Sequence, residues 1–360
     1  ALLRHVEREF DYPEQMRHAA VIDIRYLEEP GDIWPMIRDR FKEMKLISNR
    51  IVTKNTGQIA GYVLAALREN PQLRVLLMFD EADSFLDADS EEGRFNTVTG
   101  LRRIMEETGN RFKVVFAGLH SVQRFQAQIN QPLAHFGVPV CVGPLEPRAA
   151  QQLIREPLEI LGYRVSQEQV LRILSYTNNH PMLIQMFCQT LVDELKARPP
   201  SGMPPHEIEQ RRVDGVYLDP SFRNEIQVRF NLTLSLDLRY RAIALTLIND
   251  QVMDRDSYAK DYAPSDIMNL GRNWWPQGFN SIANDYFRGI LDEMVGLGVL
   301  VRTANGRYRL RSPNTARLLG LDSQIASSLE EFQKVDAPSP SDSDSYHTPL
   351  DDRGTRYGVL

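Results

Sequence analysis

The sequence predicts an α/β fold built on a parallel sheet, followed by a helical region and a second, mostly helical unit. Three observations support this prediction. In the first half, short apolar runs alternate with amphipathic segments, which is typical of a parallel sheet with helices on both faces. From Glu146 onward only helical periodicity remains. Near the C-terminus, Asn305-Gly306 lies between two short apolar segments, and this dipeptide is a strong signal for a β-hairpin.

The elements of the first half follow from the spacing of apolar residues. These residues recur every three or four positions in an amphipathic helix and run continuously in a buried strand. Helices are expected at residues 1–11, 33–48, 57–69 and 93–108. Strands are expected at residues 18–25, 73–80, 112–118 and 138–142. This succession predicts the parallel sheet.

The second half predicts a compact helical subdomain, a linker and a further unit. Helices are expected at 147–161, 167–177 and 181–196, and four prolines between 199 and 205 indicate a linker. Two or three helices followed by the hairpin form a winged-helix arrangement. We therefore expect an α/β core at 1–145, a helical lid subdomain at 146–197, a linker at 198–221, a winged-helix domain at 222–332 and a disordered tail at 333–360.

The composition is typical of a soluble globular protein with two or three domains, because 42% of the 360 residues are hydrophobic and 25% are charged. No apolar run has the roughly 18 residues that a membrane helix needs. The two cysteines, Cys141 and Cys188, have no metal-binding or redox spacing, and they indicate free thiols in the cytoplasm. The net charge of −6 gives no global attraction to nucleic acid.

One apolar run ends abruptly in two carboxylates. Residues 73–79 are mostly large and apolar, and Asp80 and Glu81 follow them directly. In open parallel sheets, ligands bind at the edge where the strands end. A carboxylate at this edge can hold Mg²⁺, and its neighbour can orient water for attack on a phosphate. The alternative is a buried strand that simply ends at solvent.

Together these features resemble the AAA+/STAND group of P-loop NTPases, over about 300 residues and in the order that the group uses. The resemblance implies an ATPase core that uses ATP and Mg²⁺, with Asp80 as the metal-binding acid of the Walker B element and Glu81 as the residue that activates water. It also places His120 at a γ-phosphate sensor position. Pro181 would open a lid helix beside the adenine, with Asn179 as a cap. A homo-oligomer and a protein effector or sensor domain are the implied partners.

One part of the group's pattern is missing from these 360 residues. The phosphate-binding motif Gly-x-x-x-x-Gly-Lys-Ser/Thr does not occur. In the group, the helix after this motif often begins Ala-Leu-Leu-Arg, as residues 1–4 do here. We therefore expect the sequence to be a fragment that starts just after the motif and lacks the first strand, and that is inactive alone.

Three other interpretations remain open. Asp80-Glu81-Ala82-Asp83 spells the signature of DEAD-box helicases, but no second parallel sheet is predicted. A DNA-binding initiator would use the basic hairpin region, through Arg302, Arg307, Arg309 and Arg311. A nucleotide-free scaffold would make no use of the acidic pair.

Overall fold

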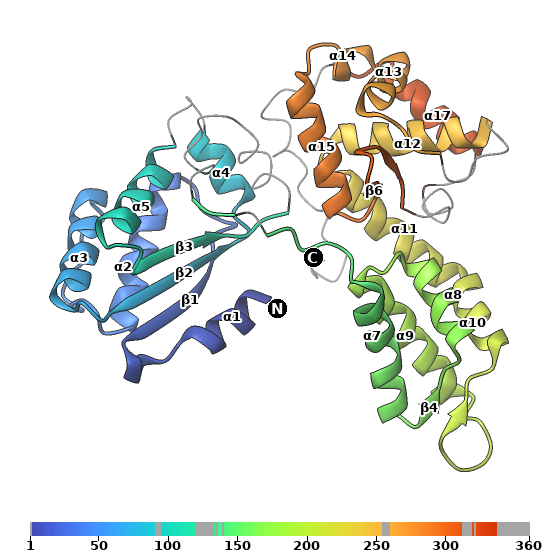
Figure 1. Ribbon diagram of the computed structural model, residues 1–360, viewed down its shortest axis with the longest axis horizontal. Coiled ribbons are helices and arrows are strands. Elements are labelled where there is room, and N and C mark those ends of the chain that lie inside the picture. The colour runs from blue at the N-terminus through green and yellow to red at the C-terminus, as the bar shows by residue number, and fades with distance from the viewer. Residues whose placement is uncertain are drawn as a thin grey trace. The chain divides into compact units, whose positions relative to one another are not determined.

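The computed structural model describes residues 2–90, 95–119, 133, 136–138, 140–253, 260–311, 319 and 322–336. The chain divides into two compact units, Ala1–Pro139 and Val140–Leu360, which are shown in Figure 1. The finer division into a core, lid, linker, winged helix and tail stays a prediction. Within the described residues, no helix is both long enough and apolar enough to cross a membrane.

Unit 1 contains a parallel sheet of three described strands, and β2 lies in its centre (Figure 1). The strands are β1 (Arg17–Asp23), β2 (Arg74–Asp80) and β3 (Phe112–Phe116). The expected α/β fold class is therefore confirmed, and these three strands lie where the sequence predicts them. Residues 75, 77 and 79 of β2 are all buried on one face, because helices cover that face completely.

Helices cover both faces of this sheet. On one face, α2 (Ile33–Glu43), α3 (Thr56–Glu69) and α5 (Asn96–Glu107) bury a core that includes Trp34 and Phe41. On the other face lies α1 (Leu2–Phe10), as Figure 1 shows. It packs Leu3 and Phe10 against Ala19, Val21 and Met78. A further helix, α4 (Asp83–Ser90), was not predicted separately, and two single 3₁₀ turns lie at Pro13–Gln15 and Pro30–Asp32.

The outer edge of β1 is closed by carboxylates of the preceding segment. The N–H of Ala19 donates to Asp11 Oδ1 over 3.0 Å, and the N–H of Val21 donates to Glu7 Oε1 over 2.9 Å. These bonds satisfy backbone donors that an edge strand otherwise leaves open for pairing with another chain.

The strand expected at 138–142 is not formed in the described part of that segment. Residues 138 and 140–142 have no strand geometry, and the three valines Val138, Val140 and Val142 are between 70% and 89% exposed. The prediction was wrong because an apolar extended segment becomes a strand only when a neighbouring strand accepts its backbone hydrogen bonds.

The first part of unit 2 is helical, as predicted. It contains α7 (Pro147–Ile160), α8 (Gln167–Thr177), α9 (Pro181–Ala197), α10 (Gln210–Leu218) and α11 (Pro220–Leu234), with the short parallel pair β4 (Tyr163–Arg164) and β5 (His206–Glu207). The segment expected as a linker is partly folded, because β5 and α10 lie within it and Val213 and Val216 of α10 are buried.

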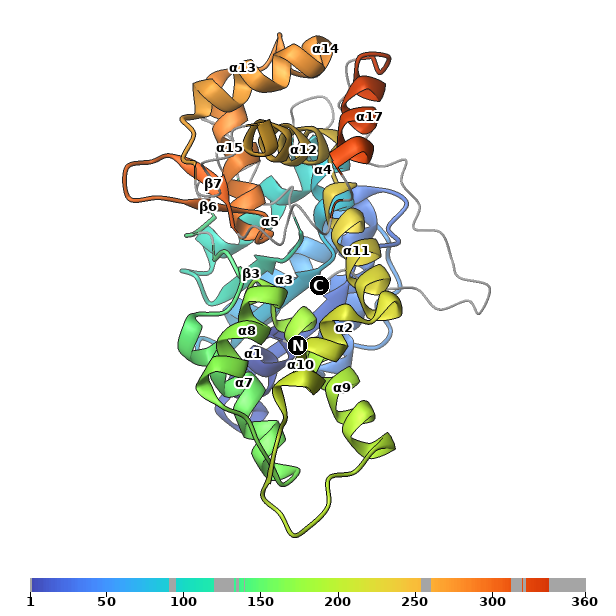
Figure 2. The same ribbon diagram turned by 90° about the vertical axis from the view of Figure 1, so that its right-hand side faces the viewer.

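The second part of unit 2 combines helices with a β-hairpin (Figure 2). Its elements are α12 (Leu238–Met253), α13 (Pro264–Trp274), α14 (Pro276–Phe279), α15 (Asn284–Gly296), β6 (Leu300–Arg302), β7 (Tyr308–Leu310) and α17 (Asp322–Phe332). The strands β6 and β7 are antiparallel. Gly306 in the connecting turn has φ of +72°, a conformation that glycine adopts without steric cost. One apolar core, from Ala150 to Phe332, joins both parts of unit 2.

Candidate functional site

The carboxyl edge of the sheet brings carboxylates from two strands together. Asp80 is the last residue of the central strand β2, and its register partner on β1 is Asp23, which is the last residue of that strand. The N–H of Ile24 donates to the carbonyl of Asp80 over 3.0 Å, so the two strands remain paired up to this edge. The Asp80 side chain is half-buried, and its Oδ1 accepts the N–H of Glu81 over 3.1 Å.

Glu81 has an unusual backbone conformation at the end of β2. Its φ is +56°, in the left-handed region that costs a residue with a Cβ about 1–2 kcal/mol. Two backbone hydrogen bonds hold the turn on both sides. The N–H of Ala82 donates to the carbonyl of Ala117 over 2.9 Å, and the N–H of Ala117 donates to the carbonyl of Phe79 over 2.8 Å. Such strain in an over-determined turn is typical of functional sites.

An arginine of the segment after β1 faces the acidic group. The Arg25 guanidinium lies 3.4 Å from Glu81 Oε1 and 3.1 Å from Asp23 Oδ2, and it reaches them from the segment just after β1. Burial raises the pKa of Glu81, Arg25 opposes this, and the charges of Asp80, Asp83 and Asp23 add to the increase. The hydrogen bond from Arg25 to Asp23 raises the pKa of Arg25.

Asp83 fixes the loop that follows β3 against the start of α4. Its Oδ2 accepts the N–H of Leu119 over 2.6 Å. A Cβ on Gly118 would lie 2.6 Å from the same oxygen, so this close approach requires glycine. The ends of β2 and β3 are thereby held together beside Asp80 and Glu81.

The Asp80 carboxylate suits a magnesium ion that is completed by other ligands. Its Oδ1 accepts one backbone hydrogen bond, and the described residues provide no hydrogen bond to its second oxygen. Mg²⁺ in nucleotide sites uses one or two carboxylates together with water and phosphate oxygens. In the described part of the chain, no group of three or more His, Cys, Asp or Glu side chains could hold a metal by itself.

Of the other predicted site residues, His120 lies outside the described residues. Pro181 is the first residue of α9, as expected for a helix-opening proline. The cap position is occupied by His180 and not by Asn179, and no side chain caps this helix. The predicted cap was wrong because both Asn178 and Asn179 have left-handed backbones, with φ of 53° and 59°, which places Asn179 in the turn before the cap.

His180 lies in a buried environment beside a cation. Its Nδ1 is buried without a hydrogen-bond partner among the described residues, and burial, followed by the charge of Arg311, lowers its pKa. Arg311 reaches this turn by donating from Nε to the carbonyl of Asn178 over 3.2 Å.

Three of the four predicted hairpin arginines contact other parts of unit 2. Arg302 pairs with Asp292 at 3.5 Å. Arg307 donates to the carbonyl of Asp261 over 2.9 Å, and Arg311 to Asn178. Arg309 makes no hydrogen bond or ion pair with the residues that the structure describes.

Sequence reasoning missed Asp23, Arg25 and Asp83 as members of this site. Asp23 and Arg25 end a strand that lies beside β2 only in the folded sheet, so no spacing along the chain connects them to Asp80. The role of Asp83 depends on its contact with Leu119, 36 residues away.

The sequence matches no protein-family profile and no curated protein. Among solved structures, the chain is similar to an ORC2 protein from Aeropyrum pernix in ADPNP–ADP complexes, with 12% identity, a TM-score of 0.49, and 88% of this chain and 79% of that chain covered. It is also similar to a RuvB mutant from Thermotoga maritima, with 13% identity, a TM-score of 0.34, and 88% of this chain and 90% of that chain covered. A third similar structure is Cdc6p from Pyrobaculum aerophilum, with 11% identity, a TM-score of 0.31, and 87% of this chain and 79% of that chain covered. Identities this low do not transfer a function from one protein to another.

Proposed function

We propose that unit 1 binds ATP with Mg²⁺ at the carboxyl edge of its sheet, and that the protein is an ATP-dependent switch of the AAA+ class. One observation supports this above the others: β2, which is central among the described strands, ends at Asp80, and Glu81 follows it directly. Open parallel sheets bind their ligands outside this edge.

Each acidic residue has a separate role in this proposal. Asp80 holds Mg²⁺, directly or through water, and the ion supplies neutralisation of phosphate charge. Glu81 orients a water molecule and accepts its proton. Its elevated pKa moves this carboxylate toward the range in which general bases work. Arg25 restrains the Glu81 carboxylate at 3.4 Å, so Glu81 has to leave this ion pair in order to act on water.

The phosphate-binding motif Gly-x-x-x-x-Gly-Lys-Ser/Thr does not occur in the 360 residues. Backbone N–H groups and the motif lysine contribute most of the grip on a triphosphate. We therefore expect the 360-residue chain to bind ATP only weakly, so the full-length gene product is the suitable sample for measurements of ATP binding and hydrolysis.

Contacts within unit 2 provide a route for relaying the nucleotide state. Arg311, next to the hairpin, contacts the Asn178 carbonyl in the turn before α9. The N–H of Leu145 donates to the carbonyl of Asn179 in the same turn over 2.9 Å. Movement of this turn would therefore shift the hairpin side of unit 2. We propose that this shape change, passed to a protein effector or sensor domain, is the output of the switch.

Binding of fluorescent ATP, with and without Mg²⁺, tests the proposal. Asp80→Asn should weaken Mg²⁺-dependent binding by about tenfold or more, the order of one lost charge-assisted interaction. The control is Glu28→Gln, which removes one negative charge from the exposed loop after β1 and should leave binding unchanged. Equal affinity of Asp80→Asn and the unsubstituted protein would refute the site and favour a nucleotide-free scaffold.

A second candidate function is DNA binding through the hairpin, as in an initiator. The observation that favours it is Arg309 in β7, which has no hydrogen-bond or ion-pair partner among the described residues. In β6, the Arg302 side chain is 55% exposed. Arg309→Gln should weaken DNA retention in a low-salt gel-shift assay, because it removes a phosphate contact. Absence of any retention by the unsubstituted protein would exclude this candidate.

A further inference from the structure

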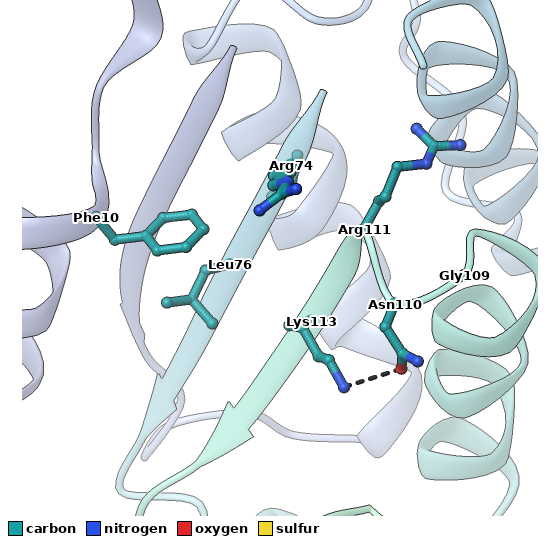
Figure 3. A pocket seen from close by; sticks show the side chains of 8 residues that line it. Phe10, Arg74, Leu76, Gly109, Asn110, Arg111 and Lys113 are labelled. Carbon is teal, nitrogen blue, oxygen red and sulfur yellow. Dashed lines mark hydrogen bonds between the residues drawn. The ribbon is translucent and has the colours of Figure 1, made fainter. Parts of the chain in front are cut away.

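A pocket of about 350 Å³ lies at the amino end of the sheet, at the opposite end of β2 from the acidic site. Figure 3 shows its lining. Phe10 enters from the end of α1, and Arg74 and Leu76 come from β2. Lys113 comes from β3, and Asn110 and Arg111 from the loop before β3. All of these residues belong to unit 1.

The sheet register places cations and an apolar floor on one face. Arg74 and Leu76 alternate with the buried residues of β2, so they project to the face that α1 partly covers. Lys113 is the register partner of Leu76, and Arg17 is that of Arg74. In Figure 3 the side chains of Phe10, Leu76 and Lys113 lie on the same side of the sheet.

The charges of this pocket are not balanced by carboxylates. Arg74 makes no side-chain hydrogen bond or ion pair with the described residues, and Lys113 Nζ donates only to Asn110 Oδ1, over 2.9 Å. Arg17, beside Arg74, stacks on the Phe10 ring at 4.6 Å. Like charges on neighbouring strands are destabilising. An anion between Arg74 and Lys113 would balance the charges of these two side chains, which the described residues leave without a carboxylate.

Arg111 has a structural role at the same place. Its guanidinium donates to the carbonyl of Leu67 over 2.6 Å and to that of Asn70 over 3.2 Å, at the end of α3. In Figure 3 its side chain extends away from Lys113 and Asn110. Arg111 therefore anchors the wall of the pocket, and Arg74 and Lys113 remain as the cations that face it.

We propose that this pocket binds a small organic phosphate, with the phosphate on Arg74, Lys113 and the Asn110 amide and an apolar group against Phe10 and Leu76. Arginine and lysine are the preferred phosphate ligands of proteins. A concave site of this volume suits a ligand of metabolite size. A nucleic acid would instead need an extended basic surface that follows its backbone.

Isothermal titration of the 360-residue chain with phenyl phosphate tests this site, with inorganic phosphate as the reference ligand. We expect saturable one-to-one binding that is tighter for phenyl phosphate, because its ring contacts Phe10 and Leu76. The double variant Arg74→Gln, Lys113→Gln should lose about tenfold or more in affinity, as expected for charge-assisted hydrogen bonds. Phe10→Leu, which keeps the packing of α1, should bring the two ligands closer in affinity.

The matched control is the double variant Arg50→Gln, Lys54→Gln. It removes the same charge from exposed positions of the α2–α3 connection that do not line the pocket. Its affinity should remain within about twofold of the unsubstituted chain, as for surface positions without a specific contact.

Three results would overturn the assignment. The first is the absence of saturable binding by the unsubstituted chain. The second is an equal loss of affinity in both double variants, which would show non-specific attraction. The third is displacement of phenyl phosphate by a short DNA duplex that binds more tightly to the same residues, which would make the surface a nucleic-acid site. A thermal melt of each variant shows whether a loss of binding reflects a loss of folding.

Discussion

The carboxylate of Glu81 lies 3.4 Å from the guanidinium of Arg25, although 56 residues separate the two in sequence. The ion pair connects the ends of two neighbouring parallel strands at the edge where we place the nucleotide. It also gives the acidic residues Asp23, Asp80 and Glu81 a common cation.

Arg25→Gln should raise the pKa of Glu81 further. Burial already raises this pKa, and the charge of Arg25 is the main influence that opposes the increase. The ¹³C chemical shift of the Glu81 carboxyl group, followed by NMR through a pH titration, measures the change. Arg38→Gln is the control, because Arg38 pairs with Asp39 on α2. An unaltered pKa of Glu81 in Arg25→Gln would show that the ion pair is not formed in solution.

Glu81→Gln should stabilise the protein at neutral pH. Because burial raises the folded-state pKa of Glu81 above its unfolded value, the folded state binds this proton more tightly than the unfolded state does. Stability from this group is therefore fully present below the unfolded pKa and declines as pH rises through the folded pKa. Urea unfolding at several pH values should show that the free energy of unfolding of the variant increases relative to that of the unsubstituted protein as pH rises. A constant difference across pH would contradict the raised pKa.

Gly118→Ala should destabilise unit 1. The new Cβ would lie 2.6 Å from Asp83 Oδ2, the atom that accepts the Leu119 N–H, and overpacking of this kind costs about 1–3 kcal/mol. The control is Gly61→Ala, because no described atom outside the local backbone of α3 lies within 4 Å of a Cβ at this position. Gly61 is inside α3, so alanine there should be neutral or should add up to about 1 kcal/mol. Equal unfolding free energies for the two variants would contradict the close approach.

Arg311→Ala should destabilise unit 2, because its half-buried guanidinium loses the bond to the Asn178 carbonyl. We expect a loss of about 1–3 kcal/mol in the free energy of unfolding. Arg309→Ala is the comparison, since Arg309 has no partner among the described residues, and it should stay within about 0.5 kcal/mol of the unsubstituted protein. The idea of a relay through this turn fails if the Arg311 variant is as stable as the Arg309 variant.

The sequence predicts unit 1 well where one local pattern decides the structure. The run from Arg74 to Phe79 forms a strand because its large apolar side chains are buried by helices on both sides of the sheet. Its end at Asp80 follows from the change to polar residues. The segment at 138–142 has a similar local pattern, yet its valines are exposed, because strand formation also needs a partner strand that composition does not reveal.

The candidate site is predictable only in part, for a related reason. Asp80 and Glu81 can be identified from the sequence because they directly follow an apolar run. Arg25 follows Asp23 on another strand, and only the register of β1 against β2 brings it to Glu81. The basic pocket depends in the same way on the register of Leu76 with Lys113.

Hydrolysis of ATP by the full-length gene product tests the central claim most directly, when binding and single-turnover rate are measured on the same sample of Glu81→Gln. We expect nucleotide binding to be retained and the rate of hydrolysis to fall by about 10²–10⁴-fold, as for loss of a general base, while Glu28→Gln hydrolyses ATP at the unsubstituted rate. Unchanged hydrolysis in Glu81→Gln would contradict the account.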